Sequence, residues 1–248
     1  MPEIDIPEEL SKIFSKSTRV VVLTGAGVSA ESGMPTFRGE DGWWRNYRAE
    51  ELATPQAFAR DPKLVWEWYD MRRKIIHDCK PNPAHETISK MEKYFDNFQL
   101  ITQNVDGLHR RAGNESVIEL HGNLWRVRCV EEGKIFDFEE VPLKEIPPVC
   151  SCGALIRPDV VWFGEMLPRD QLDAAFEAAQ TCEVIFVVGT SGIVQPAASI
   201  PIMAKQSGAL LIEVNLEPTP ISTFADHSFL GKAGEVMPKL WKFIKVRI

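Results

Sequence analysis

Two glycines follow the first long apolar run of the sequence at the spacing that many enzymes use to bind a dinucleotide. The run is Val20–Leu23, and Gly25, Gly27 and Ala30 fit the pattern G-x-G-x-x-G/A. Glycine at these positions lets backbone N–H groups approach a pyrophosphate closely. Many strand-to-helix turns carry two glycines for steric reasons alone, so the loop by itself leaves both interpretations open.

The residues after this loop do not fit a hydride-transferring enzyme. A redox Rossmann loop runs directly into a helix, whereas here segment 34–39 reads Met-Pro-Thr-Phe-Arg-Gly. Pro35 and Gly39 would interrupt or end such a helix. The sequence therefore raises the question of whether a bound dinucleotide carries hydride or is used in another way.

Polar side chains crowd the end of a second apolar run. Gln103, Asn104 and Asp106 follow the segment 98–102, and His121 follows the next such run. Asn104 or Asp106 could simply cap a helix, but a cap accounts for one of the three polar side chains only. A lone histidine is more often a structural residue, but its place beside this cluster favours a general base.

Two later strand ends could bind the rest of a dinucleotide. The small residues Gly189–Gly192 follow an apolar run and could cradle a phosphate. Asn215, Leu216 and Glu217 end another run and are placed to bind a ribose. The acidic residue usually found about 20 residues after the glycine loop would fall outside the βαβ pattern here.

Apolar runs and helical segments alternate along most of the chain. Several runs are continuous, which is typical of strands covered on both faces in a parallel sheet. Predicted strands cover 19–24, 98–102, 116–120, 159–163, 183–189 and 209–215, and predicted helices cover 7–17, 83–95, 168–182 and 232–246. This order predicts an α/β protein with a doubly wound, Rossmann-like parallel sheet that binds ligands at the carboxyl ends of its strands.

Two stretches interrupt the alternation. Residues 40–80 hold an aromatic-rich segment and a long predicted helix, and residues 122–158 hold three of the five cysteines. We expect both to form a smaller inserted lobe, partly helical and partly zinc-ribbon-like. The dinucleotide-binding domain would then be discontinuous, made of 1–39, 81–121 and 159–248. An active site is expected in the cleft between two such lobes.

The composition excludes several classes of protein. Of 248 residues 44% are hydrophobic and the formal net charge is −7, so the chain can bury a sizeable core but offers no basic patch for direct nucleic-acid binding. The uncharged segment 184–204 contains glycines and prolines, which favour a strand, a loop and a helix start over a membrane span. Five cysteines, an odd number, argue against a disulfide framework. We expect a monomeric, cytoplasmic protein that binds no membrane.

Six segments, in this order, resemble one family. They are "GAGVSAESGMPTFRG", "TQNVDGLH", "HGN", "RPDVVWFGE", "GTSGIVQPAA" and "VNLEPTP", and they span nearly the whole chain. Together they are similar to the sirtuins, the NAD-dependent protein lysine deacylases. The resemblance implies an enzyme that breaks the bond between nicotinamide and ribose and yields nicotinamide, O-acyl-ADP-ribose and free lysine. Mono-ADP-ribosyl transfer, which uses the same cleavage of NAD, is the alternative.

The resemblance also implies roles for particular residues. His121 would be the base that activates a ribose hydroxyl, Asn104 would position the ribose and a water, and Asp106 would hold the nicotinamide carboxamide. Phe37 would shield the reacting carbon from water, and Arg38 would help to order the loop against the phosphates. The further NAD contacts are Gly25, Ala26, Gly27, Trp44, Gln103, Gly189, Thr190, Ser191, Asn215, Leu216, Glu217 and Ala233.

The substrate would be an acyl-lysine side chain of a protein. By resemblance the peptide lies as a strand between segment 157–165 and the loop after Gly192, recognised largely through its backbone. Val161, Trp162 and Phe163 would line the channel for the lysine stem. For any single one of the three, ordinary core packing is the other interpretation.

Tyr69 and Arg72 bear on the choice of acyl group. They are three residues apart and therefore share one face of a predicted helix. This pair resembles the subgroup of sirtuins that remove malonyl and succinyl groups, in which a phenol and a guanidinium bind the distal carboxylate. A solvated helix side is the other interpretation, because Arg73 and Lys74 follow directly.

The cysteines depart from the family pattern. Sirtuins usually hold a structural zinc with two C-x-x-C pairs. Here Cys129 is followed by Glu132 at the place of the second cysteine, and Cys150 and Cys152 form a shortened pair. Three thiolates could still bind zinc with a carboxylate or a water as the fourth ligand. The alternative is a lobe without metal, held by apolar packing.

Overall fold

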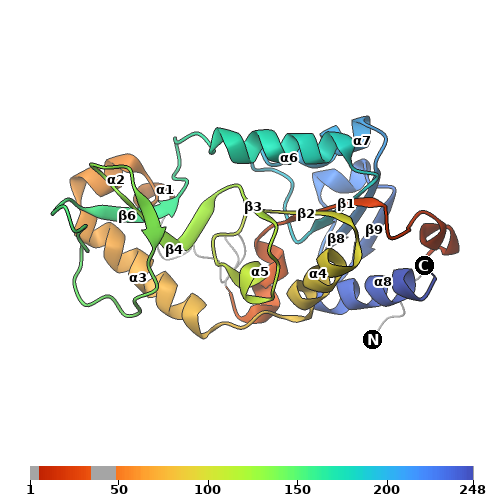
Figure 1. Cartoon of the computed structure of the whole chain (residues 1–248), viewed down its shortest axis with the longest axis horizontal. Helices are drawn as coiled ribbons and strands as arrows, with labels where there is room; N and C mark the ends of the chain where they lie inside the picture. Colours follow the sequence, from red (N-terminus) through yellow and green to blue (C-terminus); the bar gives the residue numbers. More distant parts are fainter. Residues whose placement is uncertain (1–5, 35–48, 248) are drawn as a thin grey trace.

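A parallel sheet of six strands forms the larger part of the molecule. The computed structural model describes residues 6–34 and 49–247. Within them the strand order is β3-β2-β1-β7-β8-β9, and every neighbouring pair is parallel (Figure 1). The strands are β1 (Arg19–Thr24), β2 (Asn97–Thr102), β3 (Val117–Glu119), β7 (Val184–Val188), β8 (Leu210–Asn215) and β9 (His227–Leu230).

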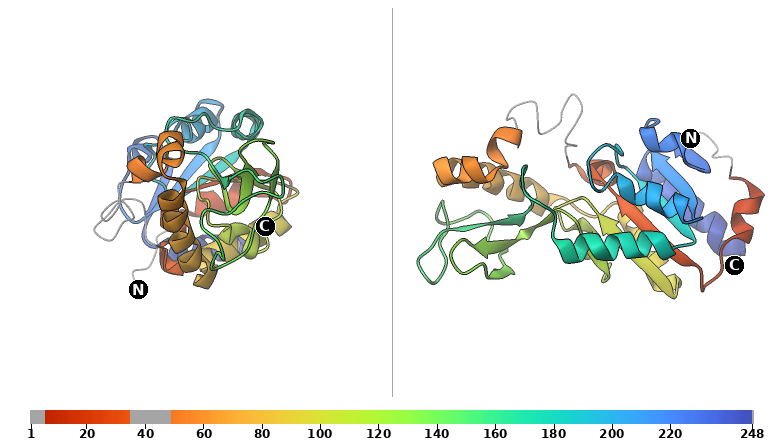
Figure 2. Two further views of the ribbon diagram at one scale, coloured as in Figure 1. Left: turned by 90° about the vertical axis from the view of Figure 1, so that its left-hand side faces the viewer. Right: turned by 90° about the horizontal axis from the view of Figure 1, so that it is seen from above.

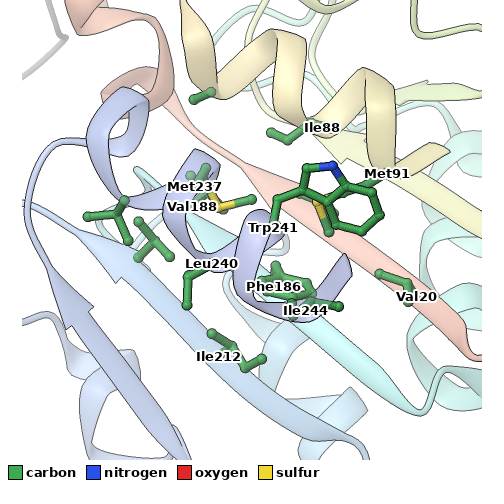
Figure 3. Packing of buried hydrophobic residues seen from close by; sticks show 14 of the residues in the cluster. Val20, Ile88, Met91, Phe186, Val188, Ile212, Met237, Leu240, Trp241 and Ile244 are labelled. Atoms are coloured by element: carbon green, nitrogen blue, oxygen red, sulfur yellow. The ribbon is translucent and has the colours of Figure 1, made fainter. Parts of the chain in front are cut away.

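Helices cover both faces of this sheet, as the continuous apolar runs predict. One side of β1, with Val20 and Val22, packs against α4 (Pro83–Tyr94) and α8 (Ala233–Arg247), whose Ile88 and Trp241 appear in Figure 3. The other side of β1 packs against α6 (Arg169–Thr181) and α7 (Ser199–Gln206). Because side chains alternate along a strand, a strand buried on both faces must be apolar throughout. The predicted doubly wound, Rossmann-like fold is confirmed.

Short helical elements complete this part of the chain. They are the 3-10 helices η1 (Glu8–Lys12), η2 (Ala26–Ser32) and η3 (Pro220–Thr223) and the single-turn helix α5 (Leu108–Arg111). The glycine loop leads into η2, which ends at Gly33 in the left-handed conformation. Within the described residues up to Met34, the helix that follows the glycines is therefore short. Among the described residues, no helix is long and apolar enough to span a membrane.

The remaining elements form what we call the small lobe. It contains the helices α1 (Ala49–Leu52), α2 (Pro55–Arg60) and α3 (Pro62–Asp78) and an antiparallel sheet of order β5-β4-β6. The strands are β4 (Gly122–Cys129), β5 (Ile135–Asp137) and β6 (Ile156–Val160). Figure 2 shows these elements at one end of the elongated molecule. An inserted lobe that is partly helical and carries the cysteines is confirmed.

One buried arginine joins the two parts of the small lobe. The Arg73 guanidinium, on α3, donates hydrogen bonds to the carbonyl oxygens of Leu124, Phe138 and Glu140. Its side chain is fully buried, so the idea that Arg73 marks a solvated side of the helix is wrong. A buried guanidinium is tolerated here because backbone carbonyls accept from both of its terminal nitrogens, although Nε has no partner among the described residues.

The strand predicted at 159–163 is misplaced. The chain is extended at Ile156–Val160 instead, and β6 pairs antiparallel with β4 in the small lobe rather than joining the parallel sheet. In the predicted run, Val160 and Trp162 are buried in the core of the small lobe, whereas Val161 is partly buried and Phe163 is exposed. Periodicity reports burial and does not say which sheet a strand joins.

Gly122 permits the close pairing of β4 with β6 directly after His121. Its φ is +80°, and a Cβ atom at this position would lie 2.1 Å from the carbonyl oxygen of Asp159. Gly133 has a φ of +65°, but a Cβ atom there would meet nothing within 4 Å. The two positions therefore share the backbone conformation and differ in the space around it.

We expect Gly122→Ala to lower the free energy of unfolding by at least about 2 kcal/mol. A left-handed backbone alone costs about 1–2 kcal/mol for a residue with a Cβ atom, and here the strands must also separate. Urea denaturation measures the loss, with Gly133→Ala as the matched control that carries the backbone cost only. Equal losses in the two variants would contradict this account.

Candidate functional site

Two loops at the carboxyl edge of the parallel sheet lie in direct contact. The N–H of Gly25 donates to the carbonyl of Val188 over 3.1 Å, and the N–H of Gly27 donates to that of Gly189 over 2.8 Å. A Cβ atom on Gly27 would lie 2.8 Å from the Cα of Gly189. The glycines, with Ala26 between them, thus allow the loop after β1 to press against the loop after β7.

Ser29 connects the glycine loop to the polar cluster after β2. Asn104 donates through Nδ2 to the Gly25 carbonyl and to Ser29 Oγ, both over 3.1 Å. Ser29 Oγ donates to Asp106 Oδ2 over 2.8 Å, and the N–H of Leu108 donates to Oδ1. Both amide hydrogens of Asn104 are thereby used, so Oδ1 is the atom it offers to a ligand.

Asp106 is a buried carboxyl group. Its residue is 5% exposed, and burial raises the pKa of Asp106, against the opposing effect of its hydrogen bonds from Leu108 and Ser29. Trp125 Nε1 also donates to the Asp106 carbonyl over 2.8 Å. The carboxyl group is therefore held rigidly, with each of its oxygens accepting a hydrogen bond.

His85 supports this arrangement from α4, and sequence reasoning missed both His85 and Ser29. The N–H of Asn82 donates to His85 Nδ1, which fixes the hydrogen on Nε2, 3.3 Å from Ser29 Oγ. Burial lowers the pKa of His85 to about 4, so the ring is neutral. The only sequence signal was its place as the third helix residue after the N-cap Asn82.

His121 lies at the end of β3, on the same edge of the sheet. Its Nδ1 is 2.9 Å from the carbonyl oxygen of Gln103. Since a carbonyl only accepts, Nδ1 carries the hydrogen and Nε2 keeps a lone pair. Burial lowers the pKa of the His121 imidazole, partly offset by this hydrogen bond. The ring is therefore a neutral base at ordinary pH.

The loops after β7 and β8 are linked to the same cluster. Gln103 Nε2 donates to Thr190 Oγ1 over 2.9 Å, and Asn215 Nδ2 donates to the Thr190 carbonyl over 2.7 Å. Ser191, Leu216 and Glu217 are exposed beside these residues.

Ala233 is the first residue of α8, and α8 contacts η2, the short helix that follows the glycine loop. The next N–H, of Gly234, donates to Glu31 Oε2 of η2 over 2.6 Å. The described candidate residues for a dinucleotide thus come together from four loops and one helix start.

Three candidate residues lie outside the described part of the chain. Phe37, Arg38 and Trp44 fall within 35–48, as do Pro35 and Gly39. Their expected roles stay predictions.

Tyr69 and Arg72 are buried side chains of α3, and Tyr69 contacts the segment after β6. Trp162 Nε1 donates to the Tyr69 hydroxyl over 2.8 Å. The Arg72 guanidinium lies 4.7 Å from the ring centre of Trp68 and 5.6 Å from that of Tyr69. Burial lowers the pKa of Arg72, whereas electrostatic interaction with Tyr69 and Asp106 raises it. The influence of Asp106 connects this pair electrostatically to the polar cluster.

The segment after β6 contacts both parts of the site. The N–H of Val161 donates to the His121 carbonyl, and the N–H of Phe163 donates to the Ala53 carbonyl, both over 2.9 Å. Phe163 is 46% exposed, so packing in the core does not account for it, whereas Val161 is partly buried. The segment thus runs from the predicted base to the small lobe.

The three cysteines and Glu132 converge in the small lobe. Their ligand atoms all lie within 4.8 Å of one another. Cys129 Sγ is 3.6 Å from Cys152 Sγ, and Cys150 Sγ is 4.0 Å from Glu132 Oε2. Three thiols and one carboxylate are a donor set that suits tetrahedral Zn²⁺. Glu132 thus places a carboxylate where the fourth donor would lie.

The fold and the polar cluster define an α/β enzyme of the dinucleotide-binding class. The Sir2 family model matches residues 25–196. A protein called NAD-dependent protein deacylase from Aquifex aeolicus is 56% identical over 93% of this chain and 97% of its own length. Another of that name from Pyrococcus furiosus is 54% identical over 96% and 97%. The chain therefore belongs to the Sir2 family, and the predicted class of NAD-dependent protein deacylase is confirmed.

Solved structures of this family match nearly the whole chain. A Sir2 homologue in complex with NAD has a TM-score of 0.91 at 50% identity and covers 98% of this chain and 95% of its own. A mutant Sir2 homologue with 2′-O-acetyl ADP ribose has a TM-score of 0.89 at 51% identity, with 97% of each chain covered. A complex of Sir2, a p53 peptide and NAD⁺ has a TM-score of 0.82 at 33% identity and covers 96% and 98%.

We expect one zinc ion per chain, with Glu132 as its weakest ligand. Loss of outer-shell partners alone costs roughly 10- to 100-fold in metal affinity, so Glu132→Ala should lose at least as much. Glu132→Cys should retain zinc at chelator concentrations that strip the natural protein, because thiolate is the stronger ligand. Metal content by mass spectrometry after dialysis against chelator provides the measurement. Equal retention by all three proteins would exclude Glu132 as a ligand.

Proposed function

We propose that this chain binds NAD along the carboxyl edge of its sheet and uses it to remove acyl groups from lysine side chains of proteins. The observation that carries the proposal is the hydrogen bond from His121 Nδ1 to the Gln103 carbonyl. It leaves Nε2 as a base beside Asn104 and Asp106. The solved relatives with NAD and with 2′-O-acetyl ADP ribose support the cofactor and the product.

Each polar residue of the cluster has one role. NAD supplies an ADP-ribosyl group, which accepts the acyl group after loss of nicotinamide. Asp106 hydrogen-bonds the nicotinamide carboxamide, and Asn104 Oδ1 accepts from a ribose hydroxyl or a water. His121 Nε2 removes the proton from a ribose hydroxyl so that its oxygen can attack the acyl carbon, and a water supplies the remaining oxygen as the lysine nitrogen leaves with a proton.

The neighbouring loops hold the rest of NAD. Gly25 and Gly27, whose own N–H groups bond to the end of β7 and the loop after it, leave room for the pyrophosphate by their missing side chains, and Ala26, Gly189, Thr190 and Ser191 line the same cradle. Asn215, Leu216 and Glu217 bind the ribose distant from the reaction, Gln103 and Ala233 complete the binding surface, and Phe37, Arg38 and Trp44 keep the roles implied by the resemblance.

The acyl-lysine enters between the segment after β6 and the loop after Gly192. Val161 and Phe163 line the channel for the lysine stem, with Val161 fixed next to His121 by its backbone hydrogen bond. The solved complex of Sir2 with a p53 peptide supports a peptide substrate. We keep a monomeric, cytoplasmic enzyme as the expectation.

Acidic acyl groups are the substrates that the buried pair favours. Tyr69 offers a hydroxyl and Arg72 a positive charge, both buried and one helical turn apart. A buried guanidinium next to a substrate channel is stabilised by an anion, and a carboxylate binds it more strongly than a neutral group can. The enzyme therefore removes succinyl and malonyl groups as well as acetyl groups.

We expect Arg72→Met to reduce desuccinylation far more than deacetylation. Hydrogen bonds to charged groups contribute about 1.5–3 kcal/mol, which corresponds to roughly a 10- to 100-fold loss of kcat/KM on succinyl-lysine. Matched acetyl-, malonyl- and succinyl-lysine peptides are assayed with NAD, with nicotinamide and acyl-ADP-ribose as readouts. Lys63→Met, which removes an exposed charge from the same helix, is the control and should lose neither activity.

The products of this assay also separate the two uses of NAD. Equal loss of both activities in Arg72→Met would overturn the acidic pocket. Mass spectrometry that finds an ADP-ribosylated protein instead of O-acyl-ADP-ribose and free lysine would favour mono-ADP-ribosyl transfer.

The pH dependence of the rate should report His121. Only the neutral ring can act as base, and burial lowers its pKa below the ordinary value of 6.5. Hence kcat/KM stays constant above about pH 6.5 and declines as the pH falls through the lowered pKa. His121→Tyr should abolish turnover, whereas a variant of the exposed His77, His77→Gln, should keep the profile. An acidic limb centred above pH 6.5 would contradict the role of His121.

A further inference from the structure

Trp162 makes a hydrogen bond whose direction is fixed by chemistry. Its Nε1 lies 2.8 Å from the Tyr69 hydroxyl, and both side chains are buried. An indole N–H can only donate, so the Tyr69 oxygen must accept. The hydrogen of the Tyr69 hydroxyl therefore points away from the indole.

The Tyr69 hydroxyl has no acceptor for that hydrogen within the part of the chain that the structure describes. Its only hydrogen bond there is the one from Trp162. Burial raises the pKa of Tyr69, so the hydrogen remains at neutral pH. A buried donor without a partner is costly. A ligand oxygen that accepts from Tyr69 would relieve this cost, and the Arg72 charge next to it favours an anionic oxygen.

The indole itself is held on two sides. The Arg157 guanidinium stacks on the Trp162 ring, 3.4 Å from its centre, and Phe58 packs against it at 5.3 Å. Glu165 accepts two hydrogen bonds from Arg157, over 2.6 and 2.9 Å, and one from the backbone N–H of Trp162 over 2.8 Å. Arg157 and Glu165 thus fix the position and the tilt of the indole.

We infer that Trp162 is a positioning residue for acyl selection, which orients the Tyr69 hydroxyl toward the distal carboxylate of the acyl group. This inference rests on the proposed acidic pocket. It assigns the indole N–H a part in choosing succinyl and malonyl groups, separate from lining the channel for the lysine stem. Arg157 and Glu165 serve the same selection by holding the indole.

A double-mutant cycle on KM tests the coupling. Trp162→Phe keeps an aromatic ring but removes the N–H, and we expect a rise of roughly two- to tenfold in KM for succinyl-lysine, the range of one neutral hydrogen bond. In the Tyr69→Phe background the same change should have no further effect on this KM, because the hydroxyl is gone. For acetyl-lysine, the change in KM caused by Trp162→Phe should be equal in the natural protein and in the Tyr69→Phe variant.

Three results would overturn the inference. The first is that the effects of the two substitutions on the KM for succinyl-lysine add. The second is that the effect of Trp162→Phe on acetyl-lysine also depends on whether Tyr69 is present. The third is that Trp162→Phe lowers kcat for succinyl-lysine and leaves its KM unchanged. Glu165→Gln provides a second variant should Trp162→Phe fail to fold by circular dichroism. It should raise KM for succinyl-lysine in the same direction, and no rise there would count against the inference equally.

The same data separate this inference from the proposed pocket. If the natural protein does not turn over succinyl-lysine, or if Tyr69→Phe leaves its KM unchanged, the pocket itself is wrong. If Tyr69→Phe raises KM and Trp162→Phe does not, the pocket stands and the role of Trp162 fails.

Discussion

Three hydrogen bonds meet at the Oγ atom of Ser29, and the polar site depends on them. Ser29 accepts from His85 and from Asn104 and donates to Asp106. These partners come from α4 and from the loop after β2, which are distant in sequence. A carboxyl group as deeply buried as Asp106 needs such a donor, because an unsatisfied buried acceptor costs about 1–3 kcal/mol or more. The hydroxyl thus fixes Asp106 and Asn104 in one arrangement.

The segment after β6 extends this arrangement into the small lobe. Within a few residues it bonds to the His121 carbonyl through Val161, to Tyr69 through Trp162 and to Ala53 through Phe163. The chemistry proposed for His121 and the recognition proposed for Tyr69 would therefore depend on one short piece of backbone. A displacement of this segment would change the geometry at both His121 and Tyr69, since packed interiors transmit strain.

Sequence reasoning found the residues at the strand ends, because parallel strands bring their carboxyl ends to one edge. His121, Asn104 and Asp106 follow from this rule. Ser29 and His85 could not be found, since a serine in a loop and a histidine near a helix start look like ordinary caps. Their role depends on hydrogen bonds that span 56 and 77 positions of sequence. Only the fold specifies such pairings.

Two of the predictions from the sequence were wrong for physical reasons. The apolar run near Val160 reads as a strand covered on both faces, but the cover comes from the small lobe rather than from the helices of the large sheet. Arg73 reads as a solvated charge because burial of a guanidinium is rare, yet three backbone carbonyls make it possible. In both cases the structure depends on a contact with a distant part of the chain, which the local sequence pattern does not specify.

The two interpretations of the glycine loop are not alternatives. The steric one holds, since a Cβ atom on Gly25 or Gly27 would collide with the loop after β7. That same contact brings the backbone of both loops into one surface at the sheet edge, which is what a pyrophosphate cradle requires. The short helix η2 then ends at Gly33, where a redox fold would continue in a helix. Close packing and cofactor binding are two consequences of the same missing side chains.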